Sequence, residues 1–107
     1  MSELNKIELY KSGMTQFAQQ DFTGALATFS QAIQVDPHFA DVYQAMAHCH
    51  EKLGDLDEAL RCAQLAVEYN PDDFLAHTSL SIFYQRKGMI AEAEREKALA
   101  AQLQQPR

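Results

Sequence analysis

The chain has 107 residues, of which 47% are hydrophobic, and its formal net charge at pH 7 is −6. This hydrophobic content is too high for a disordered tail, and the acidic balance argues against nucleic-acid binding, which normally requires a basic face. No apolar run approaches the ~20 residues of a membrane span, and no signal peptide is recognisable. A single cytoplasmic domain with no membrane partner is therefore expected. Cys49 and Cys62 make no disulfide framework and are expected to be unactivated thiols in or near the core.

Apolar residues recur at helical rather than alternating spacing along the whole chain. This spacing predicts six helices, near residues 4–19, 22–35, 39–52, 55–69, 73–87 and 89–104. Gly54 and Gly88 can adopt the left-handed conformation that ends a helix. Asp36 and Asn70 each precede a proline, which moves them out of the α region and ends the helix before them. Because the connections are short, neighbouring helices are expected to pack antiparallel in an all-α fold.

The chain repeats itself with a period of 34 residues, which separates Pro37 from Pro71 and Gly54 from Gly88. Small residues recur in the same register, at Ala25, Ala59 and Ala93, at Ala32, Ala66 and Ala100, and at Gly13, Ala47 and Ser81. The units are expected to run over about residues 6–39, 40–73 and 74–107, as three repeats of one domain over residues 1–107. One helix pair cannot bury its apolar face alone, whereas three stacked pairs make a continuous core.

These residues resemble the signature of the tetratricopeptide-repeat family. The stretch GDLDEALRCAQLAVEYNP, residues 54–71, resembles the end of the family's repeat almost throughout, and QDFTGALATFSQAIQVDP, residues 20–37, nearly as well. The resemblance implies a right-handed superhelix of three helix-turn-helix repeats, with six antiparallel helices in an α-solenoid and a concave inner face. It also implies a non-catalytic protein–protein interaction module: an adaptor, a scaffold or a chaperone-like protein.

The last helix departs from this pattern. Lys97 stands where Phe29 and Ala63 stand in the earlier units, and Glu94 and Glu96 flank it. We therefore expect this helix to be polar on the side that would receive a fourth repeat, as a terminal capping helix should be.

In tetratricopeptide domains the first helix of each repeat builds the inner face, where a peptide or helix of a partner binds. Transferred residue by residue, the resemblance places on this face Ile7, Tyr10, Met14 and Phe17 from the first unit, Asp41, Gln44, His48, Glu51 and Lys52 from the second, and Leu75, Thr78, Ile82, Gln85 and Arg86 from the third. The four residues of the first unit follow spacings of three and four and form an apolar stripe. A groove for an amphipathic helix or an extended, at least partly apolar peptide is expected.

Two other hypotheses explain the same apolar stripe. It could pair with its twin, which would make the protein a structural homo-oligomer such as a homodimer. Alternatively, the first helix could be rotated so that the stripe packs on the second helix. An exposed apolar stripe indicates a contact but does not identify the partner.

One subset of the family binds the acidic C-terminus of heat-shock chaperones through a clamp of lysine, asparagine and arginine residues. In this sequence the five clamp positions are occupied by Tyr10, Met14, Ala45, Leu75 and Ser79. None of these side chains can neutralise a carboxylate. We therefore expect no binding of chaperone tails by this mode.

Nothing in the sequence predicts catalysis, because it contains no phosphate loop, dinucleotide fingerprint or nucleophile elbow. His48 and His50 point to different sides of a helix and cannot share one ion. His48 does share a face with Asp41 and Glu51, but these groups would hold a metal only weakly. No enzyme activity, no cofactor and no metal site are therefore expected.

Overall fold

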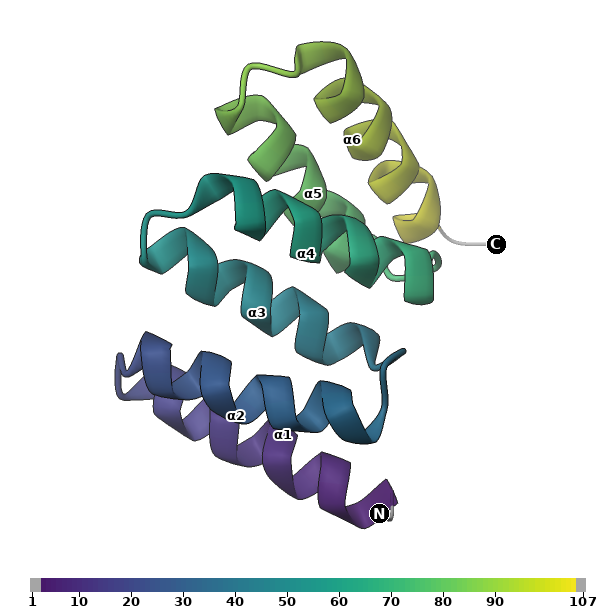
Figure 1. Ribbon diagram of the computed structural model, residues 1–107. Helices are drawn as coiled ribbons and strands as arrows, with labels where there is room; N and C mark the ends of the chain where they lie inside the picture. The colour runs from purple at the N-terminus through teal and green to yellow at the C-terminus, as the bar shows by residue number, and fades with distance from the viewer. Residues whose placement is uncertain (1–2, 106–107) are drawn as a thin grey trace.

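The computed structural model describes residues 3–105. Six α-helices fill this range: α1 (Glu3–Ala18), α2 (Phe22–Val35), α3 (Ala40–Lys52), α4 (Leu56–Tyr69), α5 (Phe74–Arg86) and α6 (Ile90–Gln104). The expected helices are confirmed, and their bounds agree to within one residue. The helices pair as α1–α2, α3–α4 and α5–α6. These pairs stack in chain order into a curved array (Figure 1). No described helix is both long enough and apolar enough to cross a membrane.

The turn inside each helix pair is closed by a residue in the left-handed conformation. Gly54 and Gly88 have φ values of 86° and 79°. The matching residue of the first pair is Gln20, with φ 66°, which carries a steric cost of about 1 kcal/mol that glycine avoids. The side chains of Asp21 and Asp55 follow two of these turns and accept backbone N–H groups at the starts of α2 and α4.

Two hydrophobic clusters fill the interior. The first joins α1, α2 and α3 around the fully buried Phe29 and Val42, and the second joins α3, α4 and α5 around Leu60 and Phe83. Met46 of α3 packs against both clusters, so the core is continuous from the first pair to the third. Alanines in the 34-residue register let the helices approach closely, and each is at most 5% exposed: Ala25, Ala32, Ala59, Ala66, Ala93 and Ala100.

The contact between α1 and α2 depends on the missing side chain of Gly13. A Cβ at this position would lie 2.4 Å from Cε1 of Phe29, well inside the 3.0 Å below which non-bonded Cβ contacts essentially never occur. The equivalent positions of the second pair hold Ala47 and Ala63, which are buried in one cluster. The two pairs thus fill the same place in the stack differently, with one large ring in the first and two methyl groups in the second.

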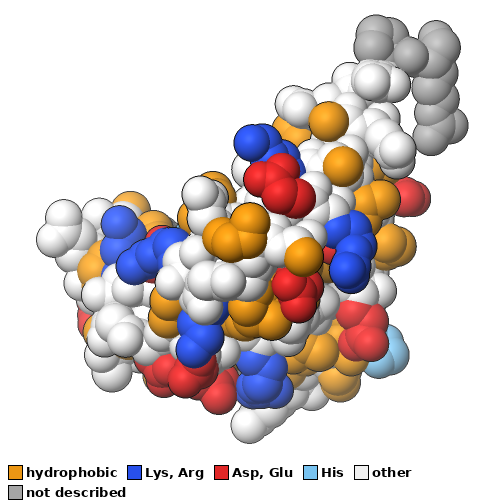
Figure 2. All heavy atoms as spheres, turned by 90° about the horizontal axis from the view of Figure 1, so that it is seen from above, with side chains coloured by type: hydrophobic (Ala, Val, Ile, Leu, Met, Phe, Trp, Pro, Cys, Tyr) orange, Lys and Arg blue, Asp and Glu red, His pale blue; other side chains and the backbone are white. Residues whose placement is uncertain are grey.

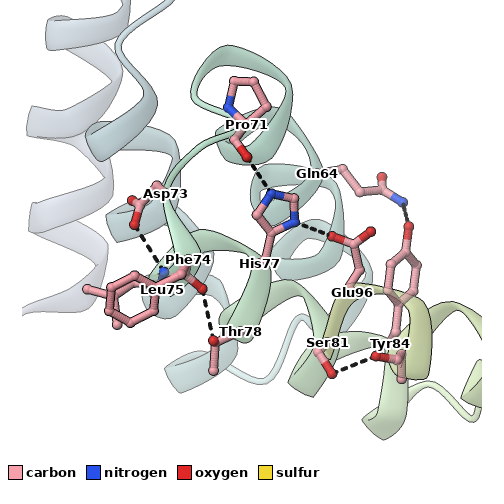
Figure 3. A network of polar contacts seen from close by, with 11 residues as sticks. Gln64, Pro71, Asp73, Phe74, Leu75, His77, Thr78, Ser81, Tyr84 and Glu96 are labelled. Atoms are coloured by element: carbon pink, nitrogen blue, oxygen red, sulfur yellow. Dashed lines mark hydrogen bonds and ion pairs between the residues drawn. The ribbon is translucent and has the colours of Figure 1, made fainter. Parts of the chain in front are cut away.

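A buried polar network joins α5 to α6 (Figure 3). His77 is 5% exposed; its Nδ1 lies 2.7 Å from a carboxylate oxygen of Glu96, and its Nε2 lies 2.7 Å from the carbonyl oxygen of Pro71. The expectation that Glu96 faces the side open to a fourth repeat is therefore wrong, because its carboxylate turns inward to His77. Lys97 and Glu94 are exposed.

Candidate functional site

The first helix of each outer pair presents large apolar side chains to solvent. On α1, Ile7 is 37% and Met14 is 40% exposed; on α5, Leu75 is 55% and Ile82 is 47% exposed. The two residues of each helix are seven apart, so they lie on one face two turns from each other. Exposed large side chains gathered at corresponding places on two helices favour a contact surface over a random scatter.

The apolar stripe of α1 is divided between core and surface. Tyr10 packs on α2, with its ring centroid 6.2 Å from that of Phe29. Phe17 packs on α2 as well, edge-on to Phe22 at 5.2 Å. Both rings are partly buried against the first cluster. Of the four residues of the stripe, only Ile7 and Met14 are exposed. The exposed apolar surface of α1 is therefore narrower than its sequence indicates.

Two adjoining hollows between α1 and α3 form what we call the α1–α3 groove. One, of about 150 Å³, is lined by Tyr10, Met14, Asp41, Gln44, Ala45 and His48. The other, of about 260 Å³, is lined by Met14, Phe17, Ala45 and His48. Each is smaller than the ~300–1,000 Å³ of a typical small-molecule site. Their size suits single side chains of a protein partner.

Sequence reasoning missed one groove residue, Ala45, whose small side chain lines both hollows. The signal was available, because Ala45 stands at one of the five clamp positions. Two other clamp positions, Tyr10 and Met14, also line the groove. The groove is therefore built from uncharged side chains where a carboxylate clamp would need cations.

A polar band crosses from α3 to α5 beside the groove. Arg86 donates a hydrogen bond of 2.6 Å to one carboxylate oxygen of Glu51. The other oxygen of Glu51 lies 3.4 Å from Nδ1 of His48, whose Nε2 is 3.4 Å from the hydroxyl of Ser79. Glu51 and Arg86 thus form an ion pair that links the second helix pair to the third on the surface.

The remaining expected residues are not among those that line the α1–α3 groove. Thr78, Ile82 and Gln85 line a separate hollow of about 350 Å³ between α5 and α6. Lys52 borders another hollow at the α1–α2 turn. On the face seen in Figure 2, hydrophobic side chains lie among acidic and basic ones. The structure therefore does not bring all the expected residues into one cavity.

The α1–α3 groove is lined mostly by neutral side chains and has an acidic residue at its edge. Asp41 is exposed at this edge. Burial, and secondarily the Asp41 carboxylate, raise the pKa of the Tyr10 phenol above its usual value of 10.0. Tyr10 therefore remains a neutral hydrogen-bonding group at physiological pH. Within the part of the chain whose side chains the structure describes, no lysine or arginine lines the two hollows.

Both cysteines are core thiols, as expected. Cys49 is 0% and Cys62 is 2% exposed. Burial raises the pKa of each thiol to about 11, with the neighbouring Cys62 adding to the effect at Cys49. At neutral pH both are protonated, so neither is an activated nucleophile.

Comparisons with known proteins give one family and one fold. The family model described as "Tetratricopeptide repeat" matches residues 16–82. The Hsp70-Hsp90 organizing protein of Triticum aestivum is 32% identical over 91 residues, which are 83% of this chain and only 14% of that protein. The first TPR of Spaghetti (RPAP3) bound to the HSP90 peptide SRMEEVD superposes with a TM-score of 0.91 at 17% identity, over 97% of this chain and 82% of that one. The CopN–Scc3 complex gives 0.90 at 17% identity, over 100% of this chain and 63% of that one. At such identities the structural likeness shows the fold, an α-solenoid of three helix pairs.

Proposed function

Because the chain belongs to the tetratricopeptide-repeat family, we propose that it is a non-catalytic interaction module that holds an apolar peptide or helix of a partner protein. The α1–α3 groove is the proposed site. The observation that carries this proposal is Met14, which is 40% exposed and lines both hollows of the groove. A flexible thioether beside Phe17 and Ala45 suits contact with non-polar side chains of varied shape. The module would act in the cytoplasm as an adaptor, a scaffold or a chaperone-like protein.

The charges around the groove indicate which partners fit. The chain carries a net charge of −6. Among the side chains that the structure describes, Asp41 is the only aspartate, glutamate, lysine or arginine lining the groove. A partner segment that is apolar at its centre and neutral or basic at its ends therefore complements the site. The packed core holds the groove walls in place before binding, so little of the receptor has to be ordered when the partner docks.

The SRMEEVD peptide is expected not to bind saturably in isothermal titration calorimetry. The structure of the first TPR of Spaghetti (RPAP3) contains this peptide, so that domain is the positive control. In this chain the clamp positions carry no cation, and Asp41 at the groove edge would repel the acidic residues of the peptide. Micromolar, saturable binding to this chain would show that another set of residues receives acidic tails.

Met14→Glu is expected to reduce retention of the natural partner by at least about tenfold, since an unpaired carboxylate would be desolvated in an apolar contact. The measurement is affinity capture from lysate of the source organism, with bound proteins quantified by mass spectrometry. Leu99→Glu is the matched control, because Leu99 lies on α6 and is 37% exposed, close to the 40% of Met14. It is expected to retain the partner as the wild type does.

Three outcomes of these experiments would contradict the proposal. Equal retention by wild type and Met14→Glu would place binding elsewhere. Loss of the helical circular-dichroism spectrum would show that Met14 is part of the core. Recovery of only this chain, together with a mass of twice 12.1 kDa in light scattering that falls to one chain in the variant, would establish a homodimer through the apolar stripe.

A further inference from the structure

We propose that the chain binds a divalent transition-metal ion of the Zn²⁺ type between α3 and α4, with His50, Glu58 and Cys62 as its ligands. One ring nitrogen, one carboxylate oxygen and the Sγ of these residues all lie within 4.8 Å of one another. The set belongs to the middle helix pair and includes none of the residues that line the α1–α3 groove. It therefore adds a second site to the proposed function.

The helix pair itself brings the three side chains together. Glu58 and Cys62 are four residues apart on α4 and so lie on one face of it. His50 comes from α3, the antiparallel neighbour that packs along α4. In the first pair the positions equivalent to His50 and Cys62 hold Gln16 and Thr28, whose side chains are joined by a hydrogen bond of 2.5 Å. Side chains at these two positions thus meet across a helix pair elsewhere in the same chain.

The donor set selects the kind of ion. Zn²⁺ binds thiolate, imidazole and carboxylate at about 2.0–2.3 Å, so its ligand atoms sit closer together than 4.8 Å and small side-chain movements would close the set. Ca²⁺ and Mg²⁺ prefer oxygen ligands alone and would gain nothing from a sulfur and a nitrogen. Three protein ligands leave the fourth tetrahedral position to water or to an external group.

The present partners of the three ligand groups are weakly bound or can be replaced when the ion binds. Arg61 lies 3.3 Å from a carboxylate oxygen of Glu58, but this pair is exposed and contributes little to stability. No side-chain hydrogen bond engages the ring of His50 within the part of the chain that the structure describes. The Cys62 thiol would lose its proton to solvent as the Sγ–metal bond forms, as coordinating thiols do.

The test is a titration of the full reduced chain with Co²⁺, followed by absorbance, and then displacement with Zn²⁺. Wild type is expected to bind one equivalent of Co²⁺ with a thiolate-to-cobalt charge-transfer band, and Zn²⁺ is expected to remove the band because it binds such sites more tightly. Cys62→Ala is expected to lack the band and to bind Zn²⁺ more than about tenfold more weakly, since even changes outside the ligand set cost about that much. Cys49→Ala is the matched control, because it removes an equally buried thiol outside the set and is expected to keep both signals.

Variants at His50 and Glu58, which are both half-buried, still test the proposal if Cys62→Ala fails to fold. His50→Gln and Glu58→Gln are each expected to weaken Zn²⁺ binding by at least about tenfold while the helical spectrum is kept. The melting temperature of wild type, and of Cys49→Ala, is expected to rise with Zn²⁺ because the ion binds only the folded pair. Wild type without a saturable charge-transfer band, a band that persists in Cys62→Ala, or Zn²⁺ affinity unchanged in His50→Gln would each overturn the proposal.

Discussion

Phe29→Ala is expected to lower the free energy of unfolding by about 4 kcal/mol and to reverse the sign of the effect of Gly13→Ala. Phe29 is fully buried at the centre of the first cluster, so its removal takes away apolar burial and leaves a cavity. This loss would be a large part of the ~5–15 kcal/mol of net stability that a domain usually has.

Gly13→Ala probes the same contact from the other helix. In wild type its Cβ would lie 2.4 Å from the buried Phe29 ring, so the change is expected to cost about 1–3 kcal/mol through overpacking. In the Phe29→Ala background the methyl group enters the vacated space, and alanine favours the helix over glycine by about 1 kcal/mol. There the change is expected to stabilise the chain, because the pair then matches Ala47 and Ala63 of the middle repeat.

Urea denaturation of the four chains in this cycle measures the coupling directly. Phe83→Ala supplies the control background, because Phe83 is 1% exposed but belongs to the second cluster. There Gly13→Ala is expected to remain destabilising. Additive effects of Gly13→Ala and Phe29→Ala would contradict this explanation, because they would mean that the Phe29 ring does not determine the cost of a side chain at position 13.

Glu96→Ala is expected to lower the free energy of unfolding by about 3 kcal/mol, because it leaves a buried imidazole nitrogen without its partner. The side chains of His77 and Glu96 are only 6% and 13% exposed, and their closest atoms are 2.7 Å apart. Glu94→Ala is the control on the same helix. Glu94 is exposed, so its removal is expected to change stability by no more than about 0.5 kcal/mol.

Replacing both His77 and Glu96 tests whether the stability lost in Glu96→Ala comes from the unpaired imidazole or from the change in the shape of the site. The residues that stand in the first repeat at the places of His77 and Glu96 are Leu9 and Thr28. The combination of His77→Leu with Glu96→Thr is expected to recover most of the stability lost in Glu96→Ala, because the imidazole nitrogen that had lost its carboxylate partner is then removed as well. Equal urea midpoints for Glu96→Ala and Glu94→Ala would contradict this explanation and show that water replaces the carboxylate at no cost.

The helices could be predicted from the sequence almost to the residue, because their ends are set by local chemistry. Glycine in the left-handed conformation closes two of the turns, and the residues before the prolines end α2 and α4. The 34-residue period then fixed which helices pair. Gln20 shows how strong this signal is, since it adopts the left-handed conformation that glycine adopts at the other two turns.

The burial of the stripe on α1 could not be predicted in the same way. Residues three or four positions apart differ by only about 40–60° around a helix axis. The stripe therefore contains two lines of side chains, one through Tyr10 and Phe17 and one through Ile7 and Met14. Which line faces the core depends on the rotation of the helix against α2, and the spacing of apolar residues does not set that rotation.

Contacts between polar side chains on different helices were also beyond the sequence reasoning. The sequence predicts a polar surface position for Glu96 because it flanks Lys97, yet His77 lies opposite it across the helix pair. His50 and Cys62 stand in the same register as Gln16 and Thr28, which meet across the first helix pair. Such pairs are found by aligning the repeats and asking which positions face each other.

Photo-crosslinking from position 14 tests binding in the α1–α3 groove most directly. A photoreactive residue replaces Met14 in one chain and Leu99 in another, and the products formed in lysate are identified by mass. A different protein joined at position 14 and absent at position 99 is the predicted result. Adducts only to other copies of this chain, or the same partner joined equally at both positions, would contradict binding in the groove.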